Sequence, residues 1–342
     1  MKRLIAIFAV LSMTLAAVAR ELPRALPDGP LSQSSILAFY DSLMTAPGTQ
    51  LHGVMILQHG RVVGEMYPEP FGPAYRHTMY SCSKTLVGIG VMLAHEEGLL
   101  ALDAPILPVL RSALDSILPP EVPEGVECVH VCDLLEMSSG WTADWGLRSR
   151  SLHWLSDYLS RPLDFEPGSR FEYDSMVSYL LSAVVQAAVG RPLLDYLNEK
   201  LFVPLGIEAA WEQSPEGVSC GGWGLYLHLE SMAKIGQLLL QKGSYGGRRI
   251  LSAQSVDALS ACRRTDTWGD CYGGQVWGFK LHPGAYRADG AYGQFIIVVP
   301  EYDLVVALTQ CTTGDLARQL ESIWQVLLHP GKDDKPLSAK AW

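Results

Sequence analysis

Residues 81–97 read SCSKTLVGIGVMLAHEE, a Ser-x-x-Lys motif that runs directly into an apolar segment. Residues three apart lie on one face of a helix, so the Ser81 hydroxyl and the Lys84 amine are expected within hydrogen-bond reach. Burial of this helix disfavours a charged lysine and lowers its pKa. A deprotonated lysine beside a serine acts as its general base and makes the serine a nucleophile. The stretch therefore predicts a buried helix that begins at a reactive serine.

The motif also has a purely structural explanation, in which Ser81 caps the helix and Lys84 is a surface charge. A chain of this length holds roughly one Ser-x-x-Lys by chance, and a second copy occupies residues 231–234. Ser is a preferred N-cap residue, so capping of a helix over 231–241 is sufficient to explain Ser231. From the motif alone, both explanations of Ser81 remain open.

A third serine, Ser219, lies in GVSCG (217–221), which fits the Gly-x-Ser-x-Gly pattern of a nucleophile elbow. Asp257 and His282 follow in the chain order that a triad on such an elbow uses. An elbow must follow a buried strand, whereas the residues before this one, QSPE (213–216), favour a turn. We therefore expect Ser219 to be structural.

Tyr173 stands where the turn EPGS (166–169) leads toward a helix that begins near Met176. A tyrosine at a helix entrance can point into a cleft, and a nearby cation such as Lys84 favours its ionised form. Tyr173 is therefore a candidate to share a proton with Ser81 and Lys84, although an isolated tyrosine in such a place is structural far more often.

Strands are expected near both ends of the chain and helices between them. The strand segments alternate or run apolar between turns, and they cover residues 54–57, 62–66, 275–281, 293–299 and 304–309. The helical segments cover residues 36–44, 81–97, 133–137, 152–159, 176–189, 192–201, 231–241 and 314–328. Runs of helix and strand that do not alternate suit an α/β protein of the α+β type. We predict one antiparallel sheet, built from about 20–75 and 245–329, with a helical part inserted over about 76–244.

The first residues of the 342-residue chain resemble a targeting segment. Lys2 and Arg3 precede an apolar run that ends at the small-x-small site Ala17-Val18-Ala19. Residues 1–19 are therefore expected to be a signal peptide, and the protein to be periplasmic or secreted. An uncleaved signal segment is the alternative and the one expected route to a membrane, because no later apolar segment is long enough to span it.

Charge and composition limit the class of partner. Without Lys2 and Arg3 the chain has 24 basic and 36 acidic residues, a net charge of −12. This balance argues against nucleic-acid binding, which depends on basic patches. The segment 330–342, rich in Lys, Asp and Pro, is expected to be a loose tail.

The seven cysteines leave at least one unpaired. Cys262 and Cys271 flank a turn-like segment and are the best disulfide candidates, with burial of all seven as small apolar residues as the alternative. Cys128, His130 and Cys132 stand at alternate positions, but a structural zinc site needs four ligands and no second pair follows. No metal or cofactor is expected.

Several blocks in chain order resemble the serine hydrolases related to class C β-lactamases and penicillin-binding proteins. Over about residues 35–328, the blocks are SCSK (81–84), EEGLLALDAP (96–105), LLEMSSG (134–140), EPGSRFEY (166–173), FVPLG (202–206) and GG (221–222). The resemblance implies a β-lactamase/transpeptidase-like fold with the site between the sheet and the helical part. It also implies that Ser81 is the nucleophile, that Lys84 and Tyr173 handle its proton, and that the backbone N–H groups of Ser81 and Ala291 form an oxyanion hole.

Two departures from the family pattern bear on substrate. Tyr-x-Asn is replaced by Tyr173-Asp174-Ser175, and the Lys/His-Thr/Ser-Gly motif by Ala288-Asp289-Gly290. Both missing groups help lactam-binding members to hold the substrate, and Asp289 would repel a carboxylate unless it is buried or paired. The chain therefore looks more like the esterase and nylon-oligomer-hydrolase branch.

We predict an exported serine hydrolase that cleaves small esters or amides. The alternatives are a β-lactamase or D,D-peptidase, and a noncatalytic binding or sensor protein on the same scaffold. The side chains expected to contact substrate are Ser175, Trp141, Trp223, Asp289 and Tyr292. Trp145, Tyr226 and Trp277 are further candidates for an apolar pocket, although core packing explains each aromatic residue equally well. The sequence does not determine the oligomeric state.

Overall fold

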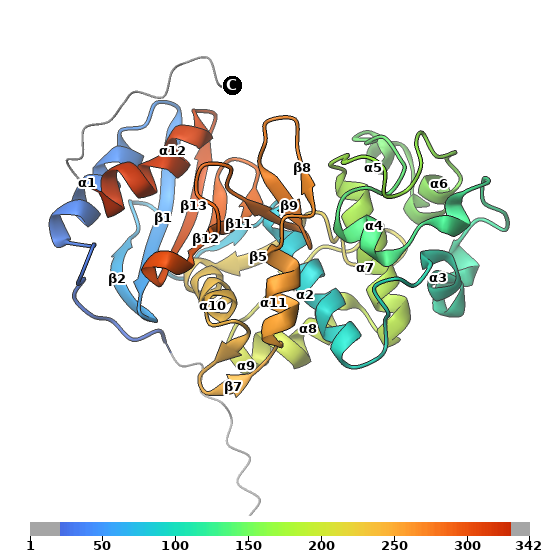
Figure 1. Cartoon of the computed structure of the whole chain (residues 1–342), viewed down its shortest axis with the longest axis horizontal. Helices are drawn as coiled ribbons and strands as arrows, with labels where there is room; N and C mark the ends of the chain where they lie inside the picture. The colour runs from blue at the N-terminus through green and yellow to red at the C-terminus, as the bar shows by residue number, and fades with distance from the viewer. Residues whose placement is uncertain (1–20, 330–342) are drawn as a thin grey trace, which may run out of the picture.

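The computed structural model describes residues 21–329, in which one large antiparallel sheet fills one half of the molecule and helices the other (Figure 1). Its strands, in spatial order, are β2 (Arg61–Met66), β1 (Thr49–Gln58), β13 (Leu304–Thr312), β12 (Gln294–Val299), β11 (Tyr286–Gly290), β10 (Val276–Gly278), β9 (Cys271–Gly273) and β8 (Arg264–Thr265). Because β1 pairs with β13, the sheet is built from both ends of the chain, as predicted.

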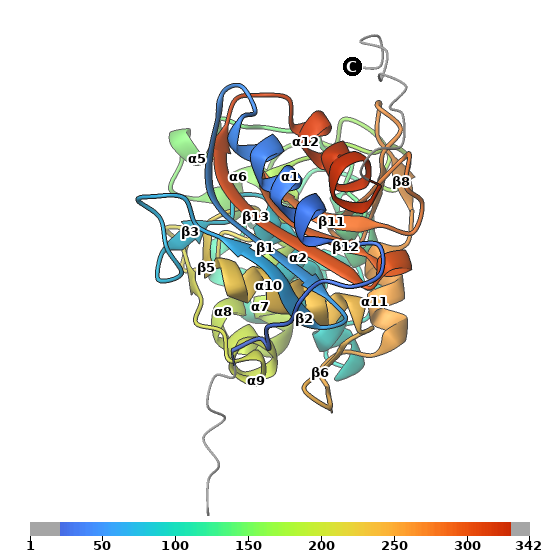
Figure 2. The same cartoon turned by 90° about the vertical axis from the view of Figure 1, so that its left-hand side faces the viewer.

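Side chains alternate between the two faces of this sheet, and each face has its own helices. Val54, Ile56 and Val306 belong to the outer apolar cluster, which α1 (Gln33–Met44), α12 (Leu316–Ser322) and the closing turn η5 (Ile323–Leu328) cover. Met55 and Val305 point to the other face, against α10 (Leu229–Leu240). Figure 2 looks onto the outer face, with α1 crossing in front of the strands.

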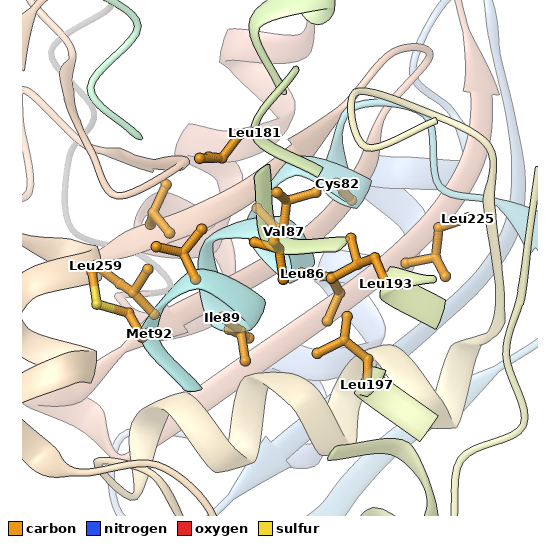
Figure 3. Packing of buried hydrophobic residues seen from close by; sticks show 14 of the residues in the cluster. Cys82, Leu86, Val87, Ile89, Met92, Leu181, Leu193, Leu197, Leu225 and Leu259 are labelled. Carbon is orange, nitrogen blue, oxygen red and sulfur yellow. The ribbon is translucent and has the colours of Figure 1, made fainter. Parts of the chain in front are cut away.

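The helix predicted over 81–97 is α2 (Cys82–Glu96), and it connects the sheet to the helical part of the molecule. From Cys82 to Ala94 every residue is buried, and Figure 3 shows its apolar side chains among those of α7, α8 and α11. A side chain at Gly88 would collide with the Gly274 carbonyl oxygen, and one at Gly90 would lie 2.9 Å from a Leu193 methyl. Both glycines therefore allow the close packing that surrounds the helix.

The helical part contains short helices around the long α7. They are α3 (Ile106–Leu114), η1 (Asp115–Ile117), η2 (Val126–Cys128), α4 (Val131–Leu135), α5 (Leu147–Arg150), α6 (Trp154–Leu159), α7 (Ser175–Val189), α8 (Leu193–Leu197), η3 (Asn198–Phe202) and α9 (Val203–Leu205). A three-stranded sheet joins β3 (Arg76–Thr78), β5 (Leu225–His228) and β4 (Ala210–Trp211). The remaining elements are the hairpin β6 (Ser244–Tyr245) and β7 (Arg248–Arg249), α11 (Ala253–Ser260) and the turn η4 (Pro300–Tyr302).

Three predictions about the fold need correction. The helical part does not extend to residue 244, because α10 packs against β1, β12 and β13. Helices α3 and α11 lie outside the predicted helical segments. Ser231 is not an N-cap, because α10 begins at Leu229 after an N-cap at His228. The expected signal peptide 1–19 and tail 330–342 lie outside the described residues.

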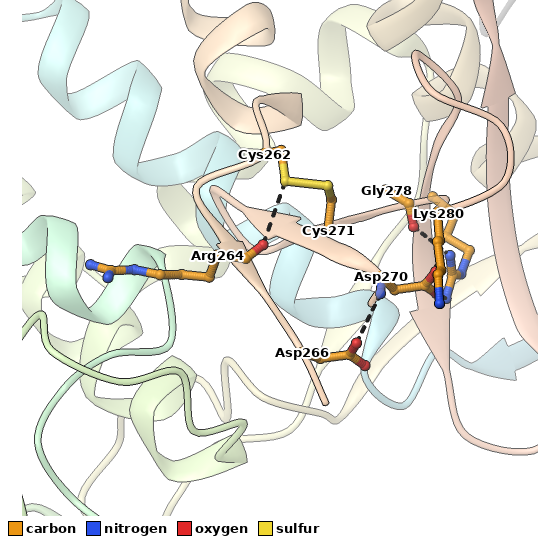
Figure 4. Close-up of a disulfide and its surroundings, with 8 residues drawn as sticks. Cys262, Arg264, Asp266, Asp270, Cys271, Gly278 and Lys280 are labelled. Atoms are coloured by element: carbon orange, nitrogen blue, oxygen red, sulfur yellow. Dashed lines mark hydrogen bonds and ion pairs between the residues drawn. A yellow bond between two sulfur atoms is a disulfide. The ribbon is translucent and has the colours of Figure 1, made fainter. Parts of the chain in front are cut away.

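The predicted disulfide between Cys262 and Cys271 is confirmed, and it closes the segment that contains β8 and the loop before β9 (Figure 4). Inside this loop, Asp266 Oδ1 accepts hydrogen bonds from the backbone N–H groups of Trp268 and Asp270, each at 2.9 Å. The covalent bond and the turn thus fix a surface segment that borders the site described below.

Residues 21–329 contain no single helix that is long and apolar enough to span a membrane. Helix α7 and the segment Leu193–Leu205 reach that length and hydropathy only when they are counted together, as a pair bent by 68°. Over the same residues, no group of three or more His, Cys, Asp or Glu side chains is arranged to hold a metal ion.

Candidate active site

Ser81 occupies the N-cap position of α2 but does not cap it. Its side chain makes no capping hydrogen bond, and its backbone is already helical, with φ −73° and ψ −9°. The preceding residue, Tyr80, has a φ of +44°, an unfavourable conformation for a bulky residue that often marks functional sites. The capping explanation of Ser81 is therefore wrong, and its hydroxyl is left for other contacts.

Lys84 is buried, with 1% of its surface exposed, so the explanation as a surface charge is also wrong. Its Nζ donates to Ser81 Oγ at 2.9 Å, to Ser175 Oγ at 3.0 Å and to the Gly222 carbonyl oxygen at 2.8 Å. Among residues 21–329 the hydrogen-bond partners of Nζ are these three oxygens, and none belongs to a carboxylate. Burial lowers the pKa of Lys84 to about 7, with the more distant charge of Asp174 opposing the shift. Near neutral pH a large fraction of Lys84 is thus an uncharged amine in contact with the serine hydroxyl.

Tyr173 stands two residues before Ser175, the first residue of α7. Lys84 Nζ is 4.9 Å from the centre of its ring, which also packs against Tyr272 and Trp277. Burial raises the pKa of Tyr173, and a hydrogen bond with Ser81 lowers it by less. The side chain is therefore a protonated phenol at neutral pH, not the phenolate considered in the sequence analysis.

Asp174 and Ser175 position the start of α7 at the site. Asp174 is the N-cap, with Oδ1 accepting from the Met176 N–H at 2.9 Å and Oδ2 accepting from the Tyr158 hydroxyl at 2.8 Å. The next residue, Ser175, is thereby held against Lys84. Sequence reasoning missed the positioning role of Asp174, although an Asp directly before a helix is a recognised capping signal.

Gly221 and Gly222 allow the chain to approach α7 closely. A side chain at either position would collide with a backbone carbonyl of that helix, from Ser178 or Ser175. The close approach brings the Gly222 carbonyl to Lys84, where it accepts a hydrogen bond. The pair of glycines was noted from the sequence, but this contact spans 138 residues and has no local signal.

Two cavities of different size meet at Ser81 and Ala291. The smaller, about 160 Å³, is also lined by Asp144, Trp145, Arg148, Ser175 and Trp223. The larger, about 650 Å³, is also lined by Tyr173, Trp277, Phe279, Asp289, Leu320 and residues of the Cys262–Cys271 loop. The structure thus brings Ser81, Tyr173 and Ala291 together at one place, with Lys84 directly behind the serine.

Asp289 lines the larger cavity, as predicted for a substrate contact, but it is not a free charge. Its Oδ2 accepts from Arg287 Nε at 2.9 Å, and Arg287 also donates to Asp270 and to the Gly278 carbonyl. Burial raises the pKa of Asp289, and Arg287 opposes that shift. Asp289 is therefore paired with Arg287, which is a condition under which it would not repel a substrate carboxylate.

The predicted aromatic contacts fall into two groups. Trp223 and Trp145 line the smaller cavity and Trp277 the larger. Trp141 was wrongly placed at the pocket, because it is fully buried in the core and donates to the Arg161 carbonyl.

Two tyrosines also fall outside the sets of residues that line the cavities. Tyr226 donates its hydroxyl to Glu212, and Tyr292 packs edge-on against Tyr80 with 46% of its surface exposed. The prediction that Tyr292 contacts substrate is therefore not supported by its position.

The competing serines are not at this site. Ser219 is fully buried and its Oγ has no hydrogen-bond partner within the described part of the chain. The other members of the suggested triad are engaged elsewhere, since Asp257 pairs with Lys242 and His282 with Glu321. The nucleophile-elbow hypothesis is therefore wrong.

Comparisons with known proteins identify relatives of this chain. A sequence model of the family described as Beta-lactamase matches residues 38–328. The chain is 23% identical to the 6-aminohexanoate-dimer hydrolase of Paenarthrobacter ureafaciens, over 85% of this chain and 80% of that protein. It is 24% identical to the N-acetylmuramyl-L-alanine amidase of Bacillus subtilis, over 56% of this chain and 57% of that protein.

The solved structures that resemble the chain share its fold at low sequence identity. EstCE1, a hydrolase with promiscuous acyltransferase activity, aligns with a TM-score of 0.70 at 18% identity, over 86% of this chain and 99% of that one. A putative 6-aminohexanoate-dimer hydrolase from Bacillus anthracis aligns with a TM-score of 0.69 at 19% identity, over 90% of this chain and 85% of that one. The chain spans about three fifths of the length of several curated relatives, such as the amidase at 57% and a putative D-alanyl-D-alanine carboxypeptidase of Escherichia coli at 63%.

Proposed function

The chain belongs to the beta-lactamase family of serine hydrolases, and from this premise we propose that it cleaves small esters or amides through an acyl-enzyme on Ser81. One observation carries the proposal: a buried Lys84, with its pKa lowered to about 7, lies 2.9 Å from the serine hydroxyl. A general base works best when its pKa is close to the working pH, because it is then both deprotonated and able to accept a proton.

In the proposed acylation, Lys84 accepts the Ser81 proton as Oγ attacks the carbonyl carbon. The backbone N–H groups of Ser81 and Ala291, at the junction of the two cavities, stabilise the negative charge that develops on the carbonyl oxygen. In the uncharged amine the two N–H groups donate to Ser175 Oγ and to the Gly222 carbonyl oxygen, which leaves the Lys84 lone pair for the Ser81 proton.

In the proposed collapse, the Tyr173 phenol donates its proton to the leaving oxygen or nitrogen as the bond to the carbonyl carbon breaks. The proton on Lys84 then passes through the Ser81 region to Tyr173, which restores the phenol. A water molecule attacks the acyl-enzyme, and Lys84 again acts as base. The acid is released with Ser81 protonated as at the start.

Esters and simple amides are favoured over β-lactams for two reasons. Ala288 stands where lactam-binding members carry a cation, and Ser175 contacts Lys84 where those members carry an Asn. Relatives that the chain matches over most of their length include the 6-aminohexanoate-dimer hydrolase. The charge of Asp289 does not disfavour a lactam carboxylate by itself, because Arg287 neutralises part of that charge.

The proposal is tested by ester hydrolysis and by active-site labelling. With p-nitrophenyl butyrate, kcat/KM is expected to rise with pH through a midpoint near 7, because the base must be uncharged. A fluorophosphonate probe should add one adduct on Ser81, detected by intact mass and peptide mapping. Absence of both would support the noncatalytic alternative, and nitrocefin turnover equal to ester turnover would support the β-lactamase alternative.

We also propose export to the periplasm or the medium, which rests on residues 1–19 alone. Fractionation of expressing cells tests it. Mature protein that begins near residue 20 in the exported fraction is expected, and full-length protein in the cytosol would contradict export.

A further inference from the structure

The two cavities beside Ser81 differ about fourfold in volume, about 650 Å³ against about 160 Å³. Cavities that bind drug-sized ligands usually measure about 300–1,000 Å³, so only the larger one has room for a bulky group. Ser81 and Ala291 line both cavities, which places the carbonyl carbon at their junction. The two halves of a substrate, acyl group and leaving group, must therefore be divided between them.

The position of Tyr173, the proposed proton donor, decides whether the leaving group or the acyl group enters the larger cavity. Tyr173 lines the larger cavity and is absent from the walls of the smaller one. Burial keeps its phenol protonated at neutral pH, and its place on the wall of the larger cavity directs the proton to a group on that side. Lys84 contacts Ser175 and Gly222, which line the smaller cavity. The leaving group is thus placed on the side of the larger cavity, and the acyl group on the other.

The walls of the larger cavity indicate what kind of leaving group fits. Its apolar surface comes from β10, β12, α12 and neighbouring loops, through Trp277, Phe279, Leu281, Phe295, Leu316 and Leu320. Leu281 and Trp268 remain 57% and 62% exposed, which extends this apolar surface to the rim.

The charged groups on the walls favour an uncharged or cationic leaving group. They are four carboxylates and two cations, a formal net charge of −2 that disfavours an anion. Arg287 is shared between Asp289 and Asp270, so it is not free to bind an anion.

We infer, on the basis of the proposed function, that the enzyme is selective for esters or amides of short acids with bulky, apolar, uncharged alcohols or amines. The leaving group fills the larger cavity and takes its proton from Tyr173, while a short acyl group remains on Ser81 beside Arg148 and Trp223. Water then releases the short acid, and the proton balance is that of simple hydrolysis.

Isomeric esters test this inference, because they have the same atoms and nearly the same apolar surface. Hexyl acetate and methyl heptanoate differ only in which side of the carbonyl carries the long chain. Hydrolysis followed by pH-stat is expected to give a kcat/KM at least about 10-fold higher for hexyl acetate, since the larger cavity can bury its hexyl chain. Equal values, or a preference for methyl heptanoate, would overturn the inference and leave the proposed function intact. No hydrolysis of either ester and no probe adduct would overturn both.

A variant that fills the cavity gives a second test. Ala317→Trp should lower the hexyl acetate to methyl heptanoate ratio by about 5-fold or more, because Ala317 lines the cavity. Arg318→Trp is the matched control, since Arg318 is exposed on the same helix and is not part of the cavity wall. An unchanged ratio in Ala317→Trp, with both variants folded by circular dichroism, would overturn the inference.

Binding to the inactive enzyme gives a readout that does not depend on catalysis. In Ser81→Ala, 1-octanol should shift the emission of Trp268 and Trp277 to shorter wavelength, because it displaces water from the larger cavity that they line. The shift should be saturable and lost in the double variant Ser81→Ala/Ala317→Phe, which fills the cavity without adding a tryptophan. A shift of the same size in the double variant would show that the alcohol does not bind in this cavity and would overturn the inference.

Discussion

The chain contains two Ser-x-x-Lys motifs on buried helices, and only one of them has the surroundings of an active site. Lys84 and Lys234 are both buried, at 1% and 5% exposed. Among residues 21–329 the hydrogen-bond partners of Lys84 are neutral oxygens, whereas Lys234 lies 3.5 Å from the carboxylate of Glu230 and 3.4 Å from a carbonyl oxygen. A neighbouring carboxylate favours the charged form of a lysine, and burial without one favours the neutral form. The same four-residue pattern therefore gives a base in one place and an ion pair in the other.

The two serines differ as clearly as the two lysines. Ser81 stands at the start of α2, where two cavities meet, and accepts a hydrogen bond from Lys84. Ser231 lies inside the first turn of α10, a helix packed against the large sheet, and is 6% exposed. A nucleophile must reach its substrate, so position along the helix separates the two motifs before any chemistry is considered.

The largest expected effect comes from removing each serine in turn. Ser81→Ala should lower kcat/KM for p-nitrophenyl butyrate by at least about 1,000-fold, because the covalent intermediate can no longer form. Ser231→Ala and Ser219→Ala should stay within about 2-fold of the parent, since neither hydroxyl is near the site. Comparable losses in Ser81→Ala and either control would remove the distinction between the two motifs.

Tyr173, whose ring centre lies 4.9 Å from Lys84 Nζ, is the next feature of the first motif to remove. Tyr173→Phe should lower kcat for hexyl acetate by about 100-fold or more, as general acids contribute about 10²–10⁴. The loss should be smaller for p-nitrophenyl acetate, because its leaving group is a weak base that needs less protonation. Tyr272→Phe is the matched control, since its ring contacts Tyr173 and its hydroxyl has no hydrogen-bond partner among residues 21–329. Equal losses for both esters would contradict the role of Tyr173 as acid.

The lowered pKa of Lys84 should also be visible in stability. The pKa of Lys84 is about 7 in the folded protein and about 10.5 in the unfolded chain, so the unfolded state binds more protons between these values. Lys84 therefore makes the free energy of unfolding rise with pH across this window, by about 1.4 kcal/mol per unit. Lys84→Met should lose this slope between pH 7.5 and 9.5, measured by urea unfolding.

Lys234→Met is the control for the stability experiment, because Lys234 is the second buried lysine of the same motif. It should keep the full pH dependence of the parent, since Lys84 is unchanged. If Lys84→Met retained the parent slope as well, the amine of Lys84 would be charged in the folded protein and the proposed base would be excluded.

Local spacing predicted the contact between Ser81 and Lys84, because both residues lie on one turn of a helix. It did not predict that Gly222 and Ser175 complete the surroundings of Lys84, since these contacts join segments 138 and 91 residues apart. The ordered blocks of the family pattern supplied Tyr173, and only the fold revealed that burial keeps it protonated.

The errors in the fold prediction have local causes. Helix α3 contains Pro108, which suggests a break but is tolerated in the first turn, where the backbone N–H groups have no partner within the helix. Helix α11 is short and buries only Ser255, Val256 and Leu259, so its periodicity is weak. Trp141 was misplaced because the sequence does not distinguish an aromatic residue of the core from one that lines a pocket.

A carboxylate placed beside Lys84 would make its surroundings resemble those of Lys234, which lies near Glu230. Ser175→Asp places a carboxylate where Lys84 now has a neutral oxygen at 3.0 Å. An opposite charge at this distance raises the pKa of a lysine by about 1–3 units, so the midpoint of the pH–kcat/KM profile should move from near 7 to about 8–10. Activity at pH 7 should fall about 10-fold or more and recover in alkaline solution.

Ser175→Asn separates charge from shape in this experiment, because Asn has nearly the size of Asp without its charge. The Asn variant should keep a midpoint near 7 even if its maximal rate falls, since the Lys84 amine still meets a neutral oxygen. A midpoint that is the same in the Asp and Asn variants would mean that the titrating base is not Lys84. The difference between the two motifs would then lie in the access of substrate to the serine and not in the charge state of the lysine.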